Sequence, residues 1–173
     1  MKIELNPVSV SPDEIQMGMR MHFEPVELPA DALSVTANIG GFTTLTAVAG
    51  HYHWPAKEVT QAAQECNARN EIAVLKKFRP LLLLVPHTQD GSHAERLMQD
   101  LLDACVSCSV KTLHFTHYGM LLNRAPLQEM EIIFQLLKNH KDASLPQTLV
   151  WDIDDRYLAE LEALHQRNFP ANG

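Results

Sequence analysis

The chain has 173 residues, of which 46% are hydrophobic and 20% charged, and its formal net charge at pH 7 is −7. This length suits one domain with a single core, so we expect residues 1–173 to form one domain. The negative charge argues against binding to nucleic-acid backbones, and the longest apolar run, residues 81–85, is too short to cross a bilayer. The spacing of the three cysteines suits a reducing compartment. We therefore expect a cytoplasmic protein with no nucleic-acid or membrane partner.

The amino-terminal segment carries weak secondary-structure signals. Residues 1–10 alternate between polar and apolar and predict an edge strand, with a helical turn over 11–17, so that residues 1–18 could add an extra edge strand and turn to the domain. A second short strand is predicted over 19–23. Residues 25–31 contain two prolines and two acids and predict a connection.

The next segment alternates between ordered elements and breaks. Residues 32–37 (ALSVTA) predict a buried strand that ends in Asn38, Gly40 and Gly41, where glycines permit either a tight turn or close backbone approach to a ligand. Residues 43–49 are ambiguous between strand and helix. Pro55 begins a predicted amphipathic helix over 56–67, and a further helical piece is expected over 71–78.

From Pro80 onward the pattern alternates regularly between strand and helix. The predicted strands are 81–85, 111–116 and 147–153, and the predicted helices are 93–106, 127–139 and 155–167. Continuous apolar strands separated by helices indicate a sheet that is covered on both faces and joined by right-handed crossovers. We predict a three-layer α/β/α domain with a mixed, mostly parallel sheet.

Polar residues follow the predicted strands, and parallel strands bring such loops to one edge of the sheet. The loops are residues 38–41, 87–93, 117–119 and 152–155. We expect the ligand pocket at this edge, although Ser92, Asp154 or Asp155 could instead cap helices. Trp151 and Asp152 end the last strand, where they could grip a base, or form a core tryptophan beside a capping acid.

Nine histidines raise the possibility of a metal site. His51 and His53 would share one strand face, His114 and His117 are three residues apart, and His87 and His93 lie nearby, but no four-ligand or HExxH pattern occurs. Cys105 and Cys108 form a CxxC at the end of a predicted helix, which indicates a structural pair rather than a redox centre. The sequence also lacks GxSxG, Walker and GxGxxG motifs, so we expect no resident cofactor or metal.

Three segments resemble the macro-domain family, whose better-known members bind ADP-ribose or related metabolites. FEPVELPADALSVTAN (residues 23–38) runs without a gap against the family pattern GDIT, a spacer and DAIVNAAN. LLVPHT (residues 83–88) is similar to the family strand VIHTVGP. Residues 115–126 have the length of the family segment FPAISTGIYGYP, and residues 148–165 resemble the closing strand and helix of the family.

This resemblance implies roles for individual residues. Glu24 falls on the acid that recognises adenine, and Asn38 on the asparagine near the distal ribose. In the diphosphate loop, Leu121 and Arg124 stand where the family has glycines, which removes the close backbone approach that a phosphate cradle uses. Arg124 could replace it with a charge-assisted clamp on phosphate or carboxylate, or be a solvated loop arginine.

The sequence thus predicts binding of a nucleotide-derived or other small anionic metabolite, and leaves open whether catalysis occurs. The expected contacts are Glu24, Asn38, Gly40, Gly41, His117, Gly119, Leu121, Arg124, Trp151 and Asp152. Any hydrolysis would use water near Asn38, helped by His117. Two alternatives remain: a histidine-based metal hydrolase, and an interaction module of the same fold without a ligand. The sequence does not define the oligomeric state.

Overall fold

The computed structural model describes residues 1–9, 30–39, 43–87, 94–116, 126–140 and 145–171. The turn expected over residues 11–17 and the strand expected over 19–23 lie outside these ranges. In the described part of the chain, no helix is both long and apolar enough to span a membrane.

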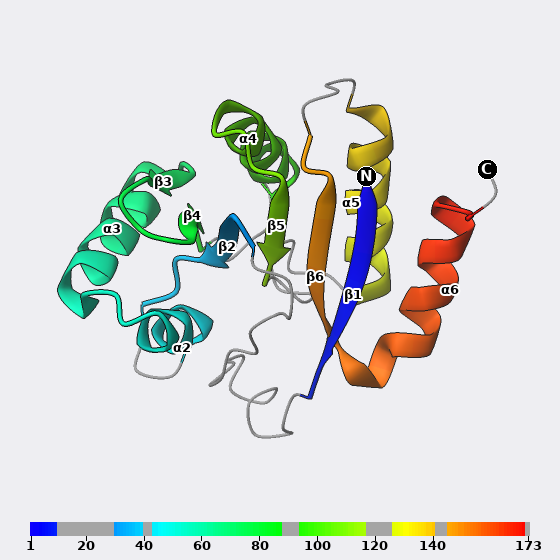
Figure 1. The fold of residues 1–173 in the computed structure, drawn as a ribbon, viewed down its shortest axis with the longest axis horizontal. Coiled ribbons are helices and arrows are strands. Elements are labelled where there is room, and N and C mark those ends of the chain that lie inside the picture. Colours follow the sequence, from blue (N-terminus) through cyan, green and yellow to red (C-terminus); the bar gives the residue numbers. More distant parts are fainter. Residues whose placement is uncertain (10–29, 40–42, 88–93, 117–125, 141–144, 172–173) are drawn as a thin grey trace.

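The described residues form a six-stranded sheet with strand order β1-β6-β5-β2-β4-β3 (Figure 1). The strands are β1 (Lys2–Val8), β2 (Ala32–Thr36), β3 (Ala73–Leu75), β4 (Leu81–Val85), β5 (Thr112–Phe115) and β6 (Thr148–Asp154). Only β3 runs antiparallel to its neighbour among these six. The predicted edge strand at the amino terminus is confirmed, because β1 pairs with β6 at one border of the sheet.

Helices cover both faces of the sheet, which confirms the three-layer α/β/α prediction. They are α2 (Thr44–His51), α3 (Ala56–Arg69), α4 (Ala94–Ser107), α5 (Pro126–Asn139) and α6 (Leu158–Asn168). On one face, α4, α5 and α6 pack on alternate strand residues such as Val85, Phe115 and Trp151. On the other face, α2 and α3 pack on the intervening residues of β2 and β4, such as Val35 and Leu84. Along β4, successive residues belong alternately to the two apolar clusters, as the pleat requires.

The ambiguous segment over residues 43–49 is a helix. Leu45, Val48 and Ala49 are buried, and their spacing places them on one helical face. The Thr43 side chain accepts a hydrogen bond from the Thr46 N–H and caps the helix. Although small and β-branched residues fit either structure, this cap and the three-residue spacing favour α2.

The helical piece expected over residues 71–78 is wrong. Asn70 ends α3 in the left-handed conformation, with φ of 53° and ψ of 44°. Residues 73–75 then form β3, which pairs with Leu82–Leu84 at the edge of β4. A free strand edge offers backbone partners to any extended neighbour, so tertiary pairing overrides the local helical preference here.

Candidate functional site

The predicted contact residues divide into two groups. Glu24, Gly40, Gly41, His117, Gly119, Leu121 and Arg124 lie outside the described residues. Asn38, Trp151 and Asp152 are described, and they do not share one environment. Asn38 lines an open pocket, whereas the side chains of Trp151 and Asp152 are buried in the sheet.

Asn38 is placed by the backbone that precedes it. It follows β2 by two residues, and its N–H donates to the Thr36 carbonyl at 2.8 Å. The carbonyl of Ala37 accepts a hydrogen bond from Nδ2 of Asn67 on α3 at 2.7 Å, and Oδ1 of Asn67 accepts from the His87 N–H at 2.9 Å. A single side chain therefore ties the carboxyl end of β2 to that of β4, and fixes the backbone at Asn38.

Removing this bridge should destabilise the protein. We expect Asn67→Ala to lower the free energy of unfolding by about 1 to 3 kcal/mol, since two hydrogen bonds are lost. Gln64→Ala, an exposed position on the same helix, is the matched control and should change it by less than about 0.5 kcal/mol. Urea denaturation measures both variants. Equal stabilities for the two would show that the bridge contributes nothing.

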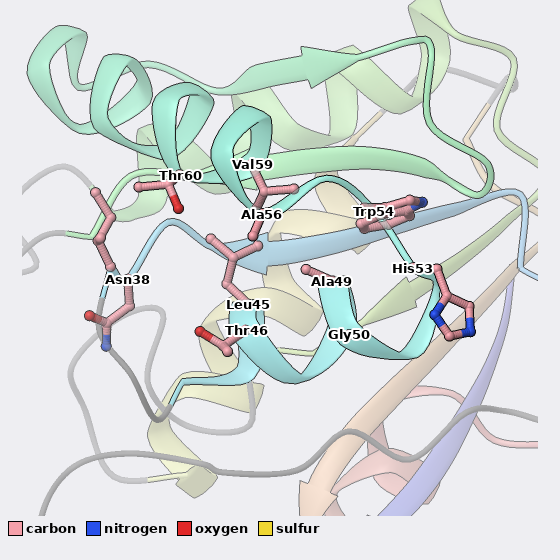
Figure 2. Close-up of a pocket in the computed structure, with 11 residues that line it drawn as sticks. Asn38, Leu45, Thr46, Ala49, Gly50, His53, Trp54, Ala56, Val59 and Thr60 are labelled. Carbon is pink, nitrogen blue, oxygen red and sulfur yellow. The ribbon is translucent and has the colours of Figure 1, made fainter.

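A pocket of about 550 Å³ opens between α2 and α3 beside Asn38 (Figure 2). This volume lies within the range of small-molecule sites. Leu45, Thr46 and Ala49 on α2 face Ala56, Val59 and Thr60 on α3; Asn38 stands at one end of the pocket, and His53 and Trp54 stand at the other. Asn38 and Thr60 bring polar groups to one end and His53 to the other, and the walls between the helices are mostly apolar.

Aromatic stacking fixes the far end of the pocket. The ring of Trp54 stacks with Tyr52 and with Phe78, in each case with centroids 5.0 Å apart. Burial raises the pKa of the Tyr52 hydroxyl. His53 has a φ of 55°, so the chain reverses between α2 and α3 through a left-handed residue. The position of Trp54 is therefore fixed by the rings that stack on it and by the turn at His53.

Trp151 belongs to the core rather than to a binding surface. Its side chain is 2% exposed, and its ring makes edge contacts with Phe115 and Phe134 at centroid distances of 5.3 and 5.8 Å. Since strand residues alternate between faces, Trp151 points toward the α4–α6 layer. This placement corrects the expectation that it stacks on a ligand.

Asp152 points to the opposite face and is fully buried. Its Oδ1 accepts a hydrogen bond from Nδ2 of Asn6 at 2.7 Å and lies 2.8 Å from Nε2 of His114. These three residues come from β1, β6 and β5, so the carboxylate links three neighbouring strands. The expectation that Asp152 binds a base is wrong, because its Oδ1 is hydrogen-bonded to side chains of the two neighbouring strands. The cap assignment next to it is confirmed, since the Asp154 side chain accepts from the Arg156 N–H.

The histidine arrangement differs from the one expected. His51 ends α2 and His53 lies in the following turn, so they do not share a strand face. Across the described ranges, no group of three or more histidine, cysteine or acidic side chains is arranged to hold a metal ion. His117, which the metal alternative needs, lies outside them.

The CxxC pair closes α4, as predicted. Cys105 is buried, and Cys108, partly exposed, follows the last residue of the helix. Burial raises the pKa of the Cys105 thiol to about 12, with a smaller contribution from Cys108. A thiol with this pKa stays protonated at neutral pH, which agrees with a structural role.

Sequence reasoning did not predict the structural roles of two residues, Asn67 and the buried His114. Asn67 lies on α3 and has no local signature, since its partners are backbone groups 20 and 30 residues away. His114 lies in an apolar strand. Its pairing with Asp152 depends on the register of β5 and β6.

Comparison with solved structures shows that the chain has a macro-domain-like fold. It is similar to the macro domain of ganglioside induced differentiation associated protein 2, with a TM-score of 0.60, 13% identity, and coverage of 98% of this chain and 85% of that one. For the Trypanosoma brucei macrodomain in complex with ADP, the TM-score is 0.55, the identity 14%, and the coverage 78% and 63%. An Oceanobacillus iheyensis macrodomain variant solved with ADP-ribose gives 0.52, 16%, 80% and 83%. No protein-family model matches, and no curated protein is similar in sequence.

Proposed function

We propose that the chain binds an ADP-ribose-like, nucleotide-derived metabolite at the carboxyl edge of its sheet. The observation that carries this proposal is Asn38, held beside an open pocket of about 550 Å³ by the Asn67 bridge. The fold adds support, because two similar macrodomains were solved with ADP and ADP-ribose. In open α/β sheets, ligands bind outside the carboxyl ends of the strands.

Asn38 would contact the ribose. Its carboxamide offers two donors and one acceptor oxygen, which suits a sugar carrying neighbouring hydroxyl groups. The rigid backbone on which it is mounted reduces the entropy lost on binding. The sheet edge at Asn38 would thus select a polyhydroxylated ligand.

The remaining contacts are proposed from the sequence resemblance alone. Glu24 would bind the base, and the loop from Gly119 to Arg124 would bind the anionic group, with the Arg124 guanidinium as a charge-assisted clamp. Gly40 and Gly41 would allow the backbone to approach the ligand. Leu121 and His117 would also contact the ligand.

A thermal-shift panel tests this function. ADP-ribose at a hundred times its dissociation constant should stabilise the protein by about 2.7 kcal/mol, because a ligand that binds only the folded state shifts the unfolding equilibrium. ADP, a sugar phosphate and Zn²⁺ complete the panel. Stabilisation by Zn²⁺ alone would favour the metal-hydrolase alternative. An unchanged melting temperature with every compound would refute the binding function and favour an interaction module.

A further inference from the structure

A second pocket lies at the amino-terminal edge of the sheet, opposite to the edge at which Asn38 lies. Its volume is about 380 Å³, within the range of small-molecule sites. Three strands begin beside it, because Asp31 precedes β2, Leu81 begins β4 and Val110 precedes β5. Since β2, β4 and β5 are parallel, the length of the strands separates this pocket from Asn38.

The guanidinium of Arg79, which lines this pocket, is anchored by the backbone. Its Nη1 donates hydrogen bonds to the carbonyl oxygens of Lys76 and Phe78, the second at 2.8 Å. These two bonds use both hydrogens of Nη1. Among the residues that the structure describes, nothing accepts from Nε or Nη2. Two parallel N–H groups along this edge are the arrangement that binds two oxygens of a phosphate or a carboxylate.

Lys76 adds a second cation to the same pocket. Within the described ranges neither Lys76 nor Arg79 forms an ion pair, whereas the neighbouring Lys77 pairs with Glu58. The whole chain has a formal charge of −7, so two unpaired cations lining one pocket contrast with the charge of the protein. Cations that share a pocket favour an anion with more than one negative charge.

The carboxylate in the lining does not cancel this positive charge. Oδ2 of Asp31 accepts hydrogen bonds from the N–H groups of Lys111 and Thr112, at 2.8 and 2.9 Å, at the start of β5. Hydrogen bonds from backbone N–H groups stabilise a carboxylate. The last carbonyl groups of α4 are also occupied, since they accept from the N–H groups of residues 108–110. The lining therefore retains a net positive charge.

Neutral residues complete the lining. Ser109 ends the turn after α4 with φ of 54° and brings a hydroxyl donor, and the partly exposed Cys108 brings a thiol. Leu81 and Val110 supply apolar contact. A phosphate group fills only part of about 380 Å³, so the pocket also has room for a small carbon skeleton.

We propose that this pocket binds a phosphate dianion, free or as the monoester of a small metabolite, through the Nε–Nη2 edge of Arg79 and the ammonium of Lys76. A phosphate monoester carries a charge of about −1.5 to −2 at pH 7 and three acceptor oxygens, which matches two cations. A carboxylate or a phosphodiester carries a single charge. The site is independent of nucleotide binding at the Asn38 edge, because ADP-ribose contains no terminal phosphate.

Alkylation of Cys108 reports the occupancy of this pocket. The other two cysteines, Cys66 and Cys105, are buried, so iodoacetamide should react first with Cys108, and mass spectrometry gives the rate. Ethyl phosphate at about four times its dissociation constant should slow the reaction about fivefold, because only unoccupied protein reacts. Dimethyl phosphate, acetate and ADP-ribose, compared at equal ionic strength, should not protect the thiol.

Two substitutions connect this protection to the cations. Arg79→Gln and Lys76→Gln should each raise the concentration of ethyl phosphate needed for half-protection by about tenfold, because each removes a charged donor. Lys57→Gln, an exposed lysine on α3 without an ion pair in the described ranges, is the matched control and should leave this concentration unchanged. Each variant is compared with itself without ligand, which removes any effect of the substitution on the thiol.

An inorganic phosphate titration distinguishes the two sources of the dianion. Protection as strong as that by ethyl phosphate identifies free phosphate as sufficient, and weaker protection identifies the ester of a metabolite; both results support the site. Protection that persists unchanged in Arg79→Gln and Lys76→Gln would refute it. Equal protection by dimethyl phosphate, or no protection by either phosphate at millimolar concentration, would also refute it and would leave the nucleotide function untouched.

Discussion

Asp152→Ala is expected to lower the free energy of unfolding by about 3 to 5 kcal/mol. The substitution leaves Nδ2 of Asn6 and Nε2 of His114 without their shared acceptor, and His114 is 1% exposed, so water cannot replace it easily. Polar groups that lose a partner in a buried site cost their full desolvation free energy. Since most domains are stable by about 5 to 15 kcal/mol, this is a large fraction of the total.

Asp152→Asn separates the hydrogen bonds from the charge. An asparagine oxygen in the same place accepts from both partners, so this variant should lose less than half of what Asp152→Ala loses. Urea denaturation monitored by circular dichroism gives both values. If Asp152→Ala is as stable as the native protein, the interstrand network does not stabilise the sheet.

Trp151→Ala is expected to cost about 3 to 5 kcal/mol, because it leaves a cavity between Phe115 and Phe134. The milder Trp151→Phe should remain folded and allow binding to be measured. Its affinity for ADP-ribose should equal that of the native protein within about twofold, since the indole lies in the core on the face opposite to α2 and α3.

The opposite result for Trp151→Phe would restore the ligand-stacking role. A loss of affinity of tenfold or more, with stability nearly unchanged, would mean that the ring contacts the ligand. Calorimetric titration together with thermal denaturation distinguishes the two results.

The second half of the fold could be predicted because its signals are local. The apolar run at residues 81–85 matches β4, and the predicted helix over 127–139 differs from α5 by one residue. The helix predicted over residues 71–78 is wrong because β3 forms only by pairing with the edge of β4. Periodicity over eight residues carries no information about a partner strand.

The site could be predicted only in part, for a similar reason. Asn38 was found from the end of a strand and from a family pattern, and it lines the pocket. Trp151 and Asp152 were expected at the end of a strand, but they lie within β6, and the alternation of faces buries them on opposite sides of the sheet. The pocket walls come from two helices whose contact is a tertiary property. Patterns along the sequence do not predict which two helices will pack together to form a pocket.

Calorimetric titration of ADP-ribose into the native protein and into Asn38→Ala tests the central claim most directly. We predict one binding site per chain, an affinity about tenfold or more weaker in Asn38→Ala because the ribose loses its amide partner, and no change in the Gln64→Ala control. Absence of binding to the native protein at millimolar ADP-ribose, or equal affinity in Asn38→Ala, would contradict the account.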